Sequence, residues 1–452
     1  MTTFWQGDLG ETIANACELA DPVMGSPHLA AWLQGYDASA PVSSNVGSHD
    51  VPFQRWMKFK EAFSPKFVVD AIAAMPRTPK RCVDPFGGSG TTALTCSFLG
   101  IEAVTIEVNP FLADLIESKL KPPSAFELSA SYETVLELAR SATVDIGPHL
   151  RRLPPSFCEP PTAGGSTAAG RFVFWRDALA RILILRMAIE VCPDERSRRL
   201  LKVLLGSVLV PASNVVVNGK GRRYRRGWSK RRIWAADIDQ LFCDAVRRAA
   251  RDLGAFGGRA RTSATLLRGD SRLLMKSIDT VDAAIFSPPY PNSFDYTDVY
   301  NLELWVLGYL DGAAANRALR RSTLRSHVQV AFENPTLEAS GLLATTVERL
   351  KCARGRLWDP RIPEMVLGYF EDMDAVMGTL HARMTRGGRV VMVVGDSQYA
   401  GIQVDVAAVL RERAEALGFS TVETREIRSM RSSAQHGGHY ELAETCLVLE
   451  RE

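Results

Sequence analysis

Hydrophobic residues along this chain fall into short runs that end in polar or glycine-containing segments, and stretches with helical spacing separate many of these runs. Short apolar runs rich in β-branched residues are typical of strands buried on both faces of a sheet. Their alternation with helices indicates an α/β protein with a mostly parallel sheet. Gly437 and Gly438 precede the final run, which predicts an antiparallel hairpin at the sheet edge. The seven expected strands are residues 81–86, 103–107, 264–270, 281–287, 388–395, 419–427 and 444–450.

The sheet pattern stops between the second and third expected strands. Residues 121–261 show helical periodicity, a break rich in Pro, Gly, Ser and Thr at 154–170, and a basic block, which predict an inserted, mainly helical region. The insertion divides the sheet domain into a first part, 61–120, and a second part, 262–452. Residues 1–60 are expected to form an irregular arm with one short helix at 11–19. Other helices are expected from Pro65, with Ser64 as N-cap, and over 302–310.

Two short motifs stand at the ends of the first and fourth expected strands. Residues 84–92 read DPFGGSGTT, a glycine-rich turn that leads into a helix, and residues 287–290 read SPPY. A glycine turn brings backbone N–H groups close to a polar ligand at a helix N-terminus. Because ligands bind at the carboxyl ends of parallel strands, the motifs are expected to form one site, with a cofactor pocket beside a pocket for a flat ring.

The two motifs resemble those of the S-adenosylmethionine-dependent DNA amino-methyltransferases, which methylate the exocyclic nitrogen of cytosine or adenine. The resemblance covers about residues 65–120 and 262–452 and leaves the arm and the insertion without a counterpart. It implies a Rossmann-like class I methyltransferase fold, S-adenosylmethionine as cofactor and double-stranded DNA as substrate. It also implies an enzyme of the restriction-modification or phage-defence type, for which a cognate restriction endonuclease or a defence-system protein is a candidate partner.

The resemblance assigns the glycine-rich run to the cofactor, with Asp84 as partner of its ammonium group. Glu107 ends the next strand and is expected to accept hydrogen bonds from both ribose hydroxyls, and Asp270 is the candidate for the adenine amino group. Thr91 or Thr92 is expected to cap the helix. The alternative is that the aspartates only form strand-end turns and that Glu107 is solvated. The expected cofactor set is Phe63, Ser64, Pro65, Asp84, Pro85, Phe86, Gly87, Gly88, Ser89, Gly90, Thr91, Thr92, Glu107, Asn109, Asp270 and Ser271.

The second motif, Ser287, Pro288, Pro289 and Tyr290, is expected to hold the target amine. The Ser287 hydroxyl and the Pro288 carbonyl can accept the amine hydrogens and so aim the nitrogen lone pair at the methyl group, while Tyr290 stacks on the base. A duplex hides this amine, so the base must be flipped out of the stack. The chemistry requires no metal. Asn292, Phe294, Asp295 and Tyr296 are expected to line the base pocket, the alternative being a polar loop that only leads into the next helix.

Residues 219–232 read GKGRRYRRGWSKRR, with eight cations and no acid. The glycines argue against a helix, so we expect a flexible loop whose cations contact phosphates and whose aromatic rings stack on bases or sugars. The alternative is a solvated surface loop. The DNA-binding candidates are Lys220, Arg222, Arg223, Tyr224, Arg225, Arg226 and Trp228. A second candidate region is 311–363, with Arg317, Arg320, Arg321, Arg325 and His327.

The serine in the second motif favours cytosine N4 as the target, because that form is commonest among the N4-cytosine enzymes. A common layout of those enzymes places SPPY before the glycine-rich motif, whereas here it follows, and this order leaves adenine N6 open. An RNA amine methyltransferase and a catalytically idle subunit that binds cofactor and DNA are further alternatives. A cytosine-C5 enzyme is rejected because it needs a Pro-Cys nucleophile loop, and Cys192-Pro193 has the reverse order.

Composition narrows the picture only slightly. The net charge of +3 and pI near 8.4 of the 452-residue chain mean that a DNA-binding surface must come from local clustering of cations. Eight cysteines without a C-x-x-C pair argue against zinc and fit a reducing cytosol. No run reaches the roughly 18 apolar residues that a membrane span needs. A cytoplasmic protein without a membrane partner is therefore expected.

Overall fold

The computed structural model describes residues 26–59, 62–141, 145, 147–159, 170–218, 221–258, 262–431 and 441–452. The helix expected at 11–19, the turn with Gly437 and Gly438, and Lys220 lie outside the described residues.

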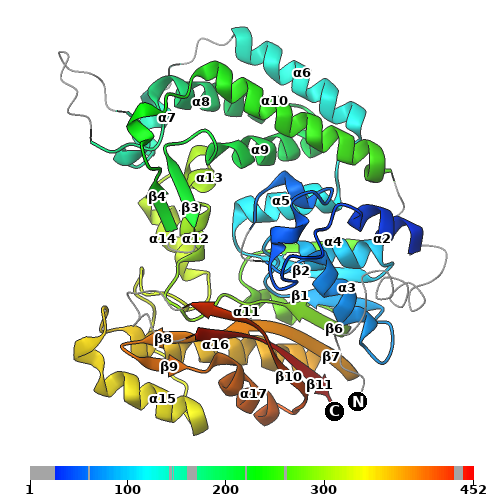
Figure 1. Ribbon diagram of the computed structural model, residues 1–452, viewed down its shortest axis with the longest axis vertical. Helices are drawn as coiled ribbons and strands as arrows, with labels where there is room; N and C mark the ends of the chain where they lie inside the picture. Colours follow the sequence, from blue (N-terminus) through cyan, green and yellow to red (C-terminus); the bar gives the residue numbers. More distant parts are fainter. Residues whose placement is uncertain are drawn as a thin grey trace.

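A seven-stranded sheet forms the centre of the molecule, in the order β10-β11-β7-β6-β1-β2-β5 (Figure 1). Neighbouring strands are parallel from β5 to β7, and β11 runs antiparallel to both β7 and β10. The predicted Rossmann-like methyltransferase sheet, with its antiparallel hairpin at one edge, is confirmed. The strands are β1 (Arg81–Asp84), β2 (Glu102–Glu107), β5 (Ala264–Arg268), β6 (Val281–Phe286), β7 (Met384–Gly395), β10 (Phe419–Arg431) and β11 (Glu441–Arg451).

Alternate residues of the central strands belong to two separate hydrophobic cores, one on each face of the sheet. On β6, Ala283 and Ile285 pack in one core, whereas Ala284 and Phe286 pack in the other. This is the period of two that a strand buried on both faces requires. Helices α3 (Pro65–Ala73), α4 (Thr91–Phe98) and α5 (Pro110–Leu120) contribute to the first core, and α15 (Gly341–Cys352), α16 (Ile362–Arg383) and α17 (Val406–Ala416) contribute to the second.

Helices between α5 and β5 form a layer set apart from the sheet (Figure 1). They are α6 (Ala125–Ser141), α7 (Gly147–Arg152), η3 (Pro155–Phe157), α8 (Arg176–Glu190), α9 (Glu195–Leu209), η4 (Trp228–Lys230), α10 (Ala235–Asp252) and η5 (Leu253–Gly257). Helix α9 packs against α5 and joins this layer to the sheet domain.

Only part of the basic block is the expected loop. Its first part is the second strand of a hairpin, β3 (Val215–Asn218) with β4 (Gly221–Tyr224), which pairs Val215 with Tyr224. The sequence analysis missed strand β4 because it considered the glycines and charges of the block and overlooked the three valines of β3, which supply a partner strand. Strand β4 contacts α12 (Tyr296–Val299), the first helix after the SPPY motif.

The N-terminal arm is packed into the molecule through α2 (Ser26–Leu33), η1 (Asn45–Ser48) and η2 (Gln54–Trp56). Trp32 stacks on Phe98 of α4, with ring centroids 4.4 Å apart. The buried carboxylate of Asp252, at the end of α10, accepts hydrogen bonds from the Phe53 backbone N–H and the Trp56 indole and pairs with Arg55. The arm therefore connects the helical layer to the sheet domain.

The remaining elements surround the carboxyl edge of the sheet or complete its second face. Helix α13 covers part of the helix expected at 302–310 but ends earlier, at Val306. These elements are α11 (Ser271–Leu274), η6 (Met275–Ser277), α13 (Asn301–Val306), α14 (Ala313–Arg321), η7 (Arg354–Arg356), β8 (Ser397–Tyr399) and β9 (Ile402–Val404).

Candidate active site

A single cavity of about 400 Å³ lies at the carboxyl ends of β1, β2, β5 and β6 and is lined by both motifs. Its wall includes Gly88 from the glycine-rich turn and Pro289 from SPPY. Of the expected cofactor residues, those that line it are Phe63, Asp84, Pro85, Phe86, Gly87, Gly88, Thr91, Glu107, Asn109, Asp270 and Ser271. Of the expected target residues, those that line it are Ser287, Pro288, Pro289, Tyr290, Asn292, Phe294 and Tyr296.

The glycine-rich turn is fixed by close packing beneath it. Gly88 has a φ of 52°, in the left-handed region that favours glycine. A Cβ on Gly87 would clash with Thr105 Oγ1 on β2, so the turn approaches this strand more closely than any other residue would permit. Buried Lys119 donates to the Ser89 carbonyl (2.6 Å), and burial lowers the pKa of this lysine to about 7.

Five expected cofactor residues do not line the cavity and have structural contacts instead. Gly90, rather than a threonine, is the N-cap of α4, which corrects the expected cap. Thr92 Oγ1 donates to the Ile285 carbonyl on β6 (3.1 Å), and Ser64 caps α3 as predicted. Together with Pro65 and Ser89, these residues shape the glycine-rich turn and the start of helix α3 from outside the cavity.

Two buried carboxylates face each other across the end of β1 and β2. Asp84 accepts a hydrogen bond from the Phe86 backbone N–H (2.9 Å), and Glu107 accepts from the N–H groups of Gly88 and Asn109 (2.7 Å each). Burial raises the pKa of each carboxyl group to about 7, because desolvation disfavours the charged form and no cation is paired with either. A ligand that brings an ammonium group and hydroxyl donors would supply what these carboxylates lack, which is the donor set of S-adenosylmethionine.

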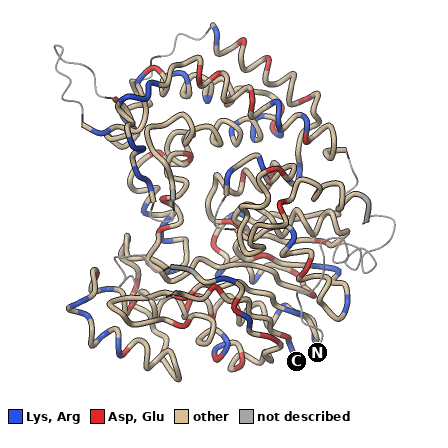
Figure 2. Tube along the Cα trace, viewed as in Figure 1, with Lys and Arg blue, Asp and Glu red and all other residues tan. Residues whose placement is uncertain are grey.

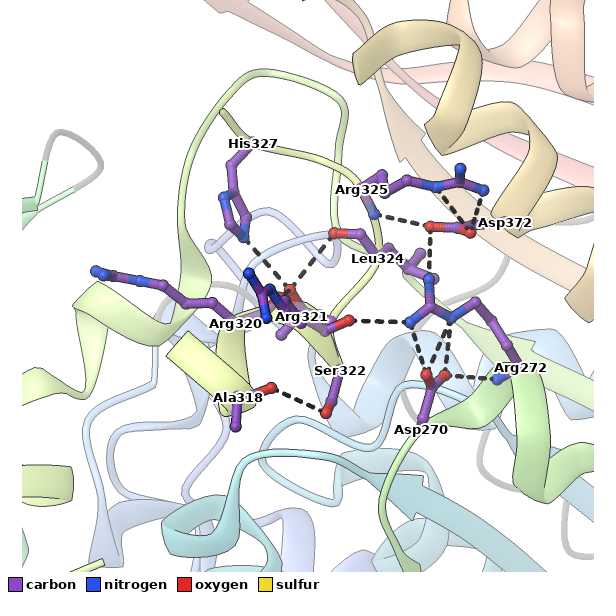
Figure 3. Close-up of polar contacts among 11 residues, drawn as sticks. Asp270, Arg272, Ala318, Arg320, Arg321, Ser322, Leu324, Arg325, His327 and Asp372 are labelled. Carbon is purple, nitrogen blue, oxygen red and sulfur yellow. Dashed lines mark hydrogen bonds and ion pairs between the residues drawn. The ribbon is translucent and has the colours of Figure 1, made fainter. Parts of the chain in front are cut away.

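Asp270 differs from these carboxylates because it already has a cationic partner. Both of its oxygens accept from the Arg272 guanidinium, at 2.6–3.1 Å, and the Arg272 backbone N–H donates to the same carboxylate (Figure 3). Arg272 also pairs with Asp372 of α16 (3.0 Å). Asp270 thus lines the cavity while both of its oxygens are already engaged by Arg272, and its contact with adenine stays a prediction.

The side chains of the SPPY motif form a hydrogen-bonded chain at the cavity wall. The Ser287 and Tyr290 hydroxyls lie 3.2 Å apart, and Tyr290 donates to Glu444 of β11 (3.1 Å). Glu444 in turn pairs with Arg428 of β10 (3.2 Å). Burial, followed by the nearby Glu444 carboxylate, raises the pKa of Tyr290 well above its usual value, so its hydroxyl stays protonated and the ring is held in one position.

Asp295 does not line the cavity, contrary to the prediction. Its carboxylate accepts from the Thr297 backbone N–H (2.9 Å) as the N-cap of α12, and it pairs with Arg320 of α14. In the sequence, Asp295 lies in the same run of polar and aromatic residues as its neighbours that line the cavity, so the pattern did not show that its side chain caps a helix instead.

Sequence reasoning missed the cavity residues that come from distant segments. The arm contributes Ser43 and Phe59, whose ring stacks on Tyr300 with centroids 5.6 Å apart. Arg428 and Glu444 come from the edge hairpin, and a segment after α14 contributes Ser322, Thr323, Leu324, Ser326 and His327. None of these lies in a motif, so only the folded chain brings them to the site.

Cations of the basic block fall into two groups. Arg223 and Arg226 are exposed, and Figure 2 shows Lys and Arg along the β3–β4 hairpin. Arg225 and Arg231 instead donate to backbone carbonyls, including that of Ser213, and so hold the hairpin in place.

The aromatic residues of this block are also in structural contacts. Trp228 packs edge-on against Phe172 (5.1 Å) and beside Tyr224 (5.6 Å), so both rings already contact other aromatic residues, and their stacking on bases or sugars stays a prediction. The guanidinium of Arg222 lies over the Phe157 ring, 5.0 Å from its centroid.

Among the described residues, no group of three or more His, Cys, Asp or Glu side chains is placed to hold a metal ion. In the same part of the chain, no helix is long and apolar enough to cross a membrane.

Curated proteins that align with most of this chain are Type II methyltransferases. No protein-family model matches the chain. The Type II methyltransferase M.AvaI of Nostoc sp. is 26% identical over 429 residues, which covers 89% of this chain and 86% of that protein. The Type II methyltransferase M.BsoBI of Geobacillus stearothermophilus is 23% identical over 424 residues, covering 85% and 82%.

Solved structures with detectable similarity are more distant. TrmN from Thermus thermophilus has a TM-score of 0.28 at 11% identity and covers 86% of this chain and 48% of its own. The rRNA methyltransferase AviRa from Streptomyces viridochromogenes has a TM-score of 0.29 at 10% identity, covering 86% and 85%. The sheet order, the cavity and the curated relatives together identify S-adenosylmethionine as the methyl donor of this chain.

Proposed function

We propose that the protein is a site-specific DNA methyltransferase that transfers a methyl group from S-adenosylmethionine to the N4 amine of cytosine in double-stranded DNA. The observation that carries this proposal is the common cavity: the glycine-rich turn with its two uncompensated carboxylates and the SPPY motif share one wall. The Type II methyltransferases M.AvaI and M.BsoBI, which align over most of the chain, support the same class of enzyme.

The chain's own groups account for the positioning that this reaction needs. S-adenosylmethionine, when bound, supplies a methyl group on a positively charged sulfur. The Ser287 hydroxyl and the Pro288 carbonyl, both from residues that line the cavity, are the proposed acceptors of the two amine hydrogens, which would direct the nitrogen lone pair out of conjugation with the ring. Tyr290 offers an aromatic face whose position is fixed by Glu444. A cavity of about 400 Å³ requires the base to leave the duplex before it reaches Ser287.

The β3–β4 hairpin is the part of the helical layer best placed to contact DNA. Strand β4 contacts α12, which contributes Tyr296 and Thr297 to the cavity. Arg223 and Arg226 therefore project from an element adjoining the proposed base pocket, and their exposed guanidinium groups suit phosphate contacts. An enzyme of this type commonly acts with a restriction endonuclease of the same recognition sequence, and such a partner is part of the proposal.

Cytosine is favoured over adenine by the serine at position 287, through the family resemblance. Adenine N6 remains the second candidate, because the order of the two motifs departs from the common layout of N4-cytosine enzymes. An RNA amine or an idle subunit receives less support, since the curated relatives are Type II methyltransferases and the SPPY residues line the cavity.

The base is identified by digesting DNA from cells that express the protein to nucleosides and detecting modified bases by mass spectrometry. We expect N4-methylcytosine, which is absent when Ser287→Ala and Tyr290→Ala are combined. N6-methyladenine alone would move the target to adenine, and methylated RNA without methylated DNA would reject the DNA assignment.

The same double variant tests how the cavity is divided. Its affinity for S-adenosylmethionine, measured by calorimetry, should stay within about threefold of the wild type, because the hydrogen bonds of these two side chains run to each other and to Glu444. Methyl transfer should fall by at least about a thousandfold, since both positioning and stacking are lost. Loss of cofactor binding together with transfer would show that the two pockets are misassigned.

A further inference from the structure

The segment from Ser322 to His327 forms a wall of the active-site cavity, although it contains no recognisable motif. His327 is 1% exposed and lines the same cavity as Ser287 and Tyr290. Gln329, two residues further on, donates to the Ser293 carbonyl (3.4 Å), which ties the segment to the loop that follows SPPY. A buried histidine is thus positioned next to the proposed base pocket.

Ion pairs hold this segment rigidly on its other side. Arg325 donates its backbone N–H (2.8 Å) and its guanidinium (2.7 Å) to Asp372 of α16. Arg272 pairs with the same aspartate and donates to the Arg321 carbonyl (3.3 Å), as Figure 3 shows. The His327 ring is therefore carried by a preorganised wall rather than by a mobile loop.

Hydrogen bonds determine which ring nitrogen of His327 carries the proton. The Gln329 backbone N–H points at Nδ1 (3.3 Å), so Nδ1 acts as an acceptor. Thr323 Oγ1 donates to the Arg320 carbonyl (2.7 Å), and its lone pairs are left to face Nε2 (3.4 Å). Burial, the largest effect, lowers the pKa of His327 below its ordinary value, so the ring is neutral at pH 7. The neutral ring then carries its hydrogen on Nε2.

The contact from Nε2 to Thr323, at 3.4 Å, is long for a hydrogen bond, so this contact engages the N–H group only weakly. A ligand acceptor at ordinary hydrogen-bond distance would bind it more strongly. The cavity thus offers acceptors at Ser287 and Pro288 and a donor at His327.

We propose that His327 Nε2–H donates to the ring nitrogen beside the target amine and so makes His327 a specificity-determining residue of the base pocket. This inference rests on the proposed function. Cytosine presents an amine donor next to the N3 acceptor, and adenine presents the same pair with N1. Guanine carries N–H groups at both N2 and N1, and thymine carries N–H at N3, so either base would place an N–H against that of His327. The pocket thereby selects an amine with an adjacent acceptor.

A substrate change tests this without altering the protein. In a duplex carrying the enzyme's own target sequence, 3-deazacytosine replaces the target cytosine and so removes the N3 acceptor (1-deazaadenine serves for adenine). We expect kcat/KM of the wild type to fall about 10- to 100-fold, because a buried donor is left unpaired. If the wild type methylates both duplexes equally, the proposed contact of His327 with the ring nitrogen is wrong. If it methylates neither duplex, the proposed function itself is wrong.

Two variants of His327 test the same contact from the side of the protein. His327→Leu should lose activity to a similar extent with the normal duplex and show less than about a twofold further loss with the deaza duplex. His327→Gln, which carries an amide N–H near the Nε2 position, should regain at least about tenfold over His327→Leu. Affinity for S-adenosylmethionine should stay within about twofold in both variants, which a general collapse of the cavity would not allow. Equal sensitivity of His327→Leu and the wild type to the deaza base would contradict the contact.

Discussion

Asp84 and Glu107 show how burial alone prepares a side chain for a ligand. Each carboxylate accepts backbone N–H groups, Asp84 also accepts from the Thr92 side chain, and burial raises the pKa of both to about 7. In the unfolded chain the same groups titrate near pH 4. A raised pKa in the folded state means that the folded protein binds more protons, so these two groups favour folding at low pH and lose that contribution as the pH rises from about 4 to about 7.

Cofactor binding should show the opposite dependence on pH. Because the charged carboxylates bind ammonium and hydroxyl donors more strongly, the dissociation constant of S-adenosylmethionine should fall about tenfold between pH 6 and pH 8 for each group that must ionise. Calorimetry at several pH values measures this, with Asp84→Asn and Glu107→Gln as the variants. Each variant should bind more weakly and show a flatter dependence; an affinity of the wild type that does not change with pH would refute the role of these carboxylates.

At the residue scale, the sequence predicted which residues end the strands. It did not predict which side chains pair with each other in the folded chain. Strand periodicity placed Asp84 and Glu107 at one sheet edge, and the cavity contains both. Arg272 pairs with both Asp270 and Asp372, which depends on side-chain geometry across two helices, and no pattern of spacing encodes it. Glu444 reaches Tyr290 only because β11 is inserted beside β7.

At the scale of elements, the DNA contacts proposed for the β3–β4 hairpin can be tested separately from its structural contacts. Replacing Arg223 and Arg226 by Ala should weaken DNA binding and lower the slope of log K against log salt by roughly 2, because each exposed cation releases about one counterion on binding a phosphate. The matched control is Arg386→Ala with Arg411→Ala, which removes the same charge from exposed positions on β7 and α17. Equal salt slopes for the two double variants would return the hairpin to an ordinary surface.

Arg225 provides the structural counterpart in the same hairpin. Its guanidinium donates to the Ser213 and Val210 carbonyls, at 3.3 and 3.0 Å. Arg225→Ala should therefore lower the free energy of unfolding by roughly 1 kcal/mol, measured by urea denaturation, whereas the pair at Arg223 and Arg226 should leave it unchanged within about 0.5 kcal/mol.

The strands that could be predicted from the sequence are those with a clear run of apolar residues. The seven strands were found because each combines β-branched or other apolar residues with a polar end. Strands β3 and β4 have four residues each and lie beside glycines and arginines, so charge and flexibility dominated the local pattern. The wall from Ser322 to His327 has no regular structure and was predictable only as a basic region.

On the scale of the whole molecule, the arm connects two layers that the sequence suggests are separate. Asp252 at the end of α10 binds Phe53, Arg55 and Trp56 of the arm, and Ser43 and Phe59 of the same arm line the cavity. These contacts join residues far apart in the chain, which explains why the arm looked irregular and without function in the sequence.

Asp252→Asn should therefore lower the free energy of unfolding by roughly 3 kcal/mol, because the Arg55 charge loses its buried partner. It should also weaken S-adenosylmethionine binding, since the arm supplies part of the cavity wall. Asp244→Asn on the same helix, where the carboxylate only meets Gln240, is the control and should change stability by less than about 0.5 kcal/mol. Equal effects of the two substitutions in urea denaturation would show that the arm is not anchored at Asp252.

The most direct test of the common cavity is a structure of the protein with a non-reactive analogue of S-adenosylmethionine and a duplex that contains the target base. We expect the analogue to lie against Gly88 and Glu107. The base should lie outside the stack, with its ring on Tyr290 and its amine at Ser287, and the amine nitrogen should be about 3 Å from the position of the methyl group. A base that stays stacked in the duplex, or an analogue bound away from the glycine-rich turn, would contradict the account.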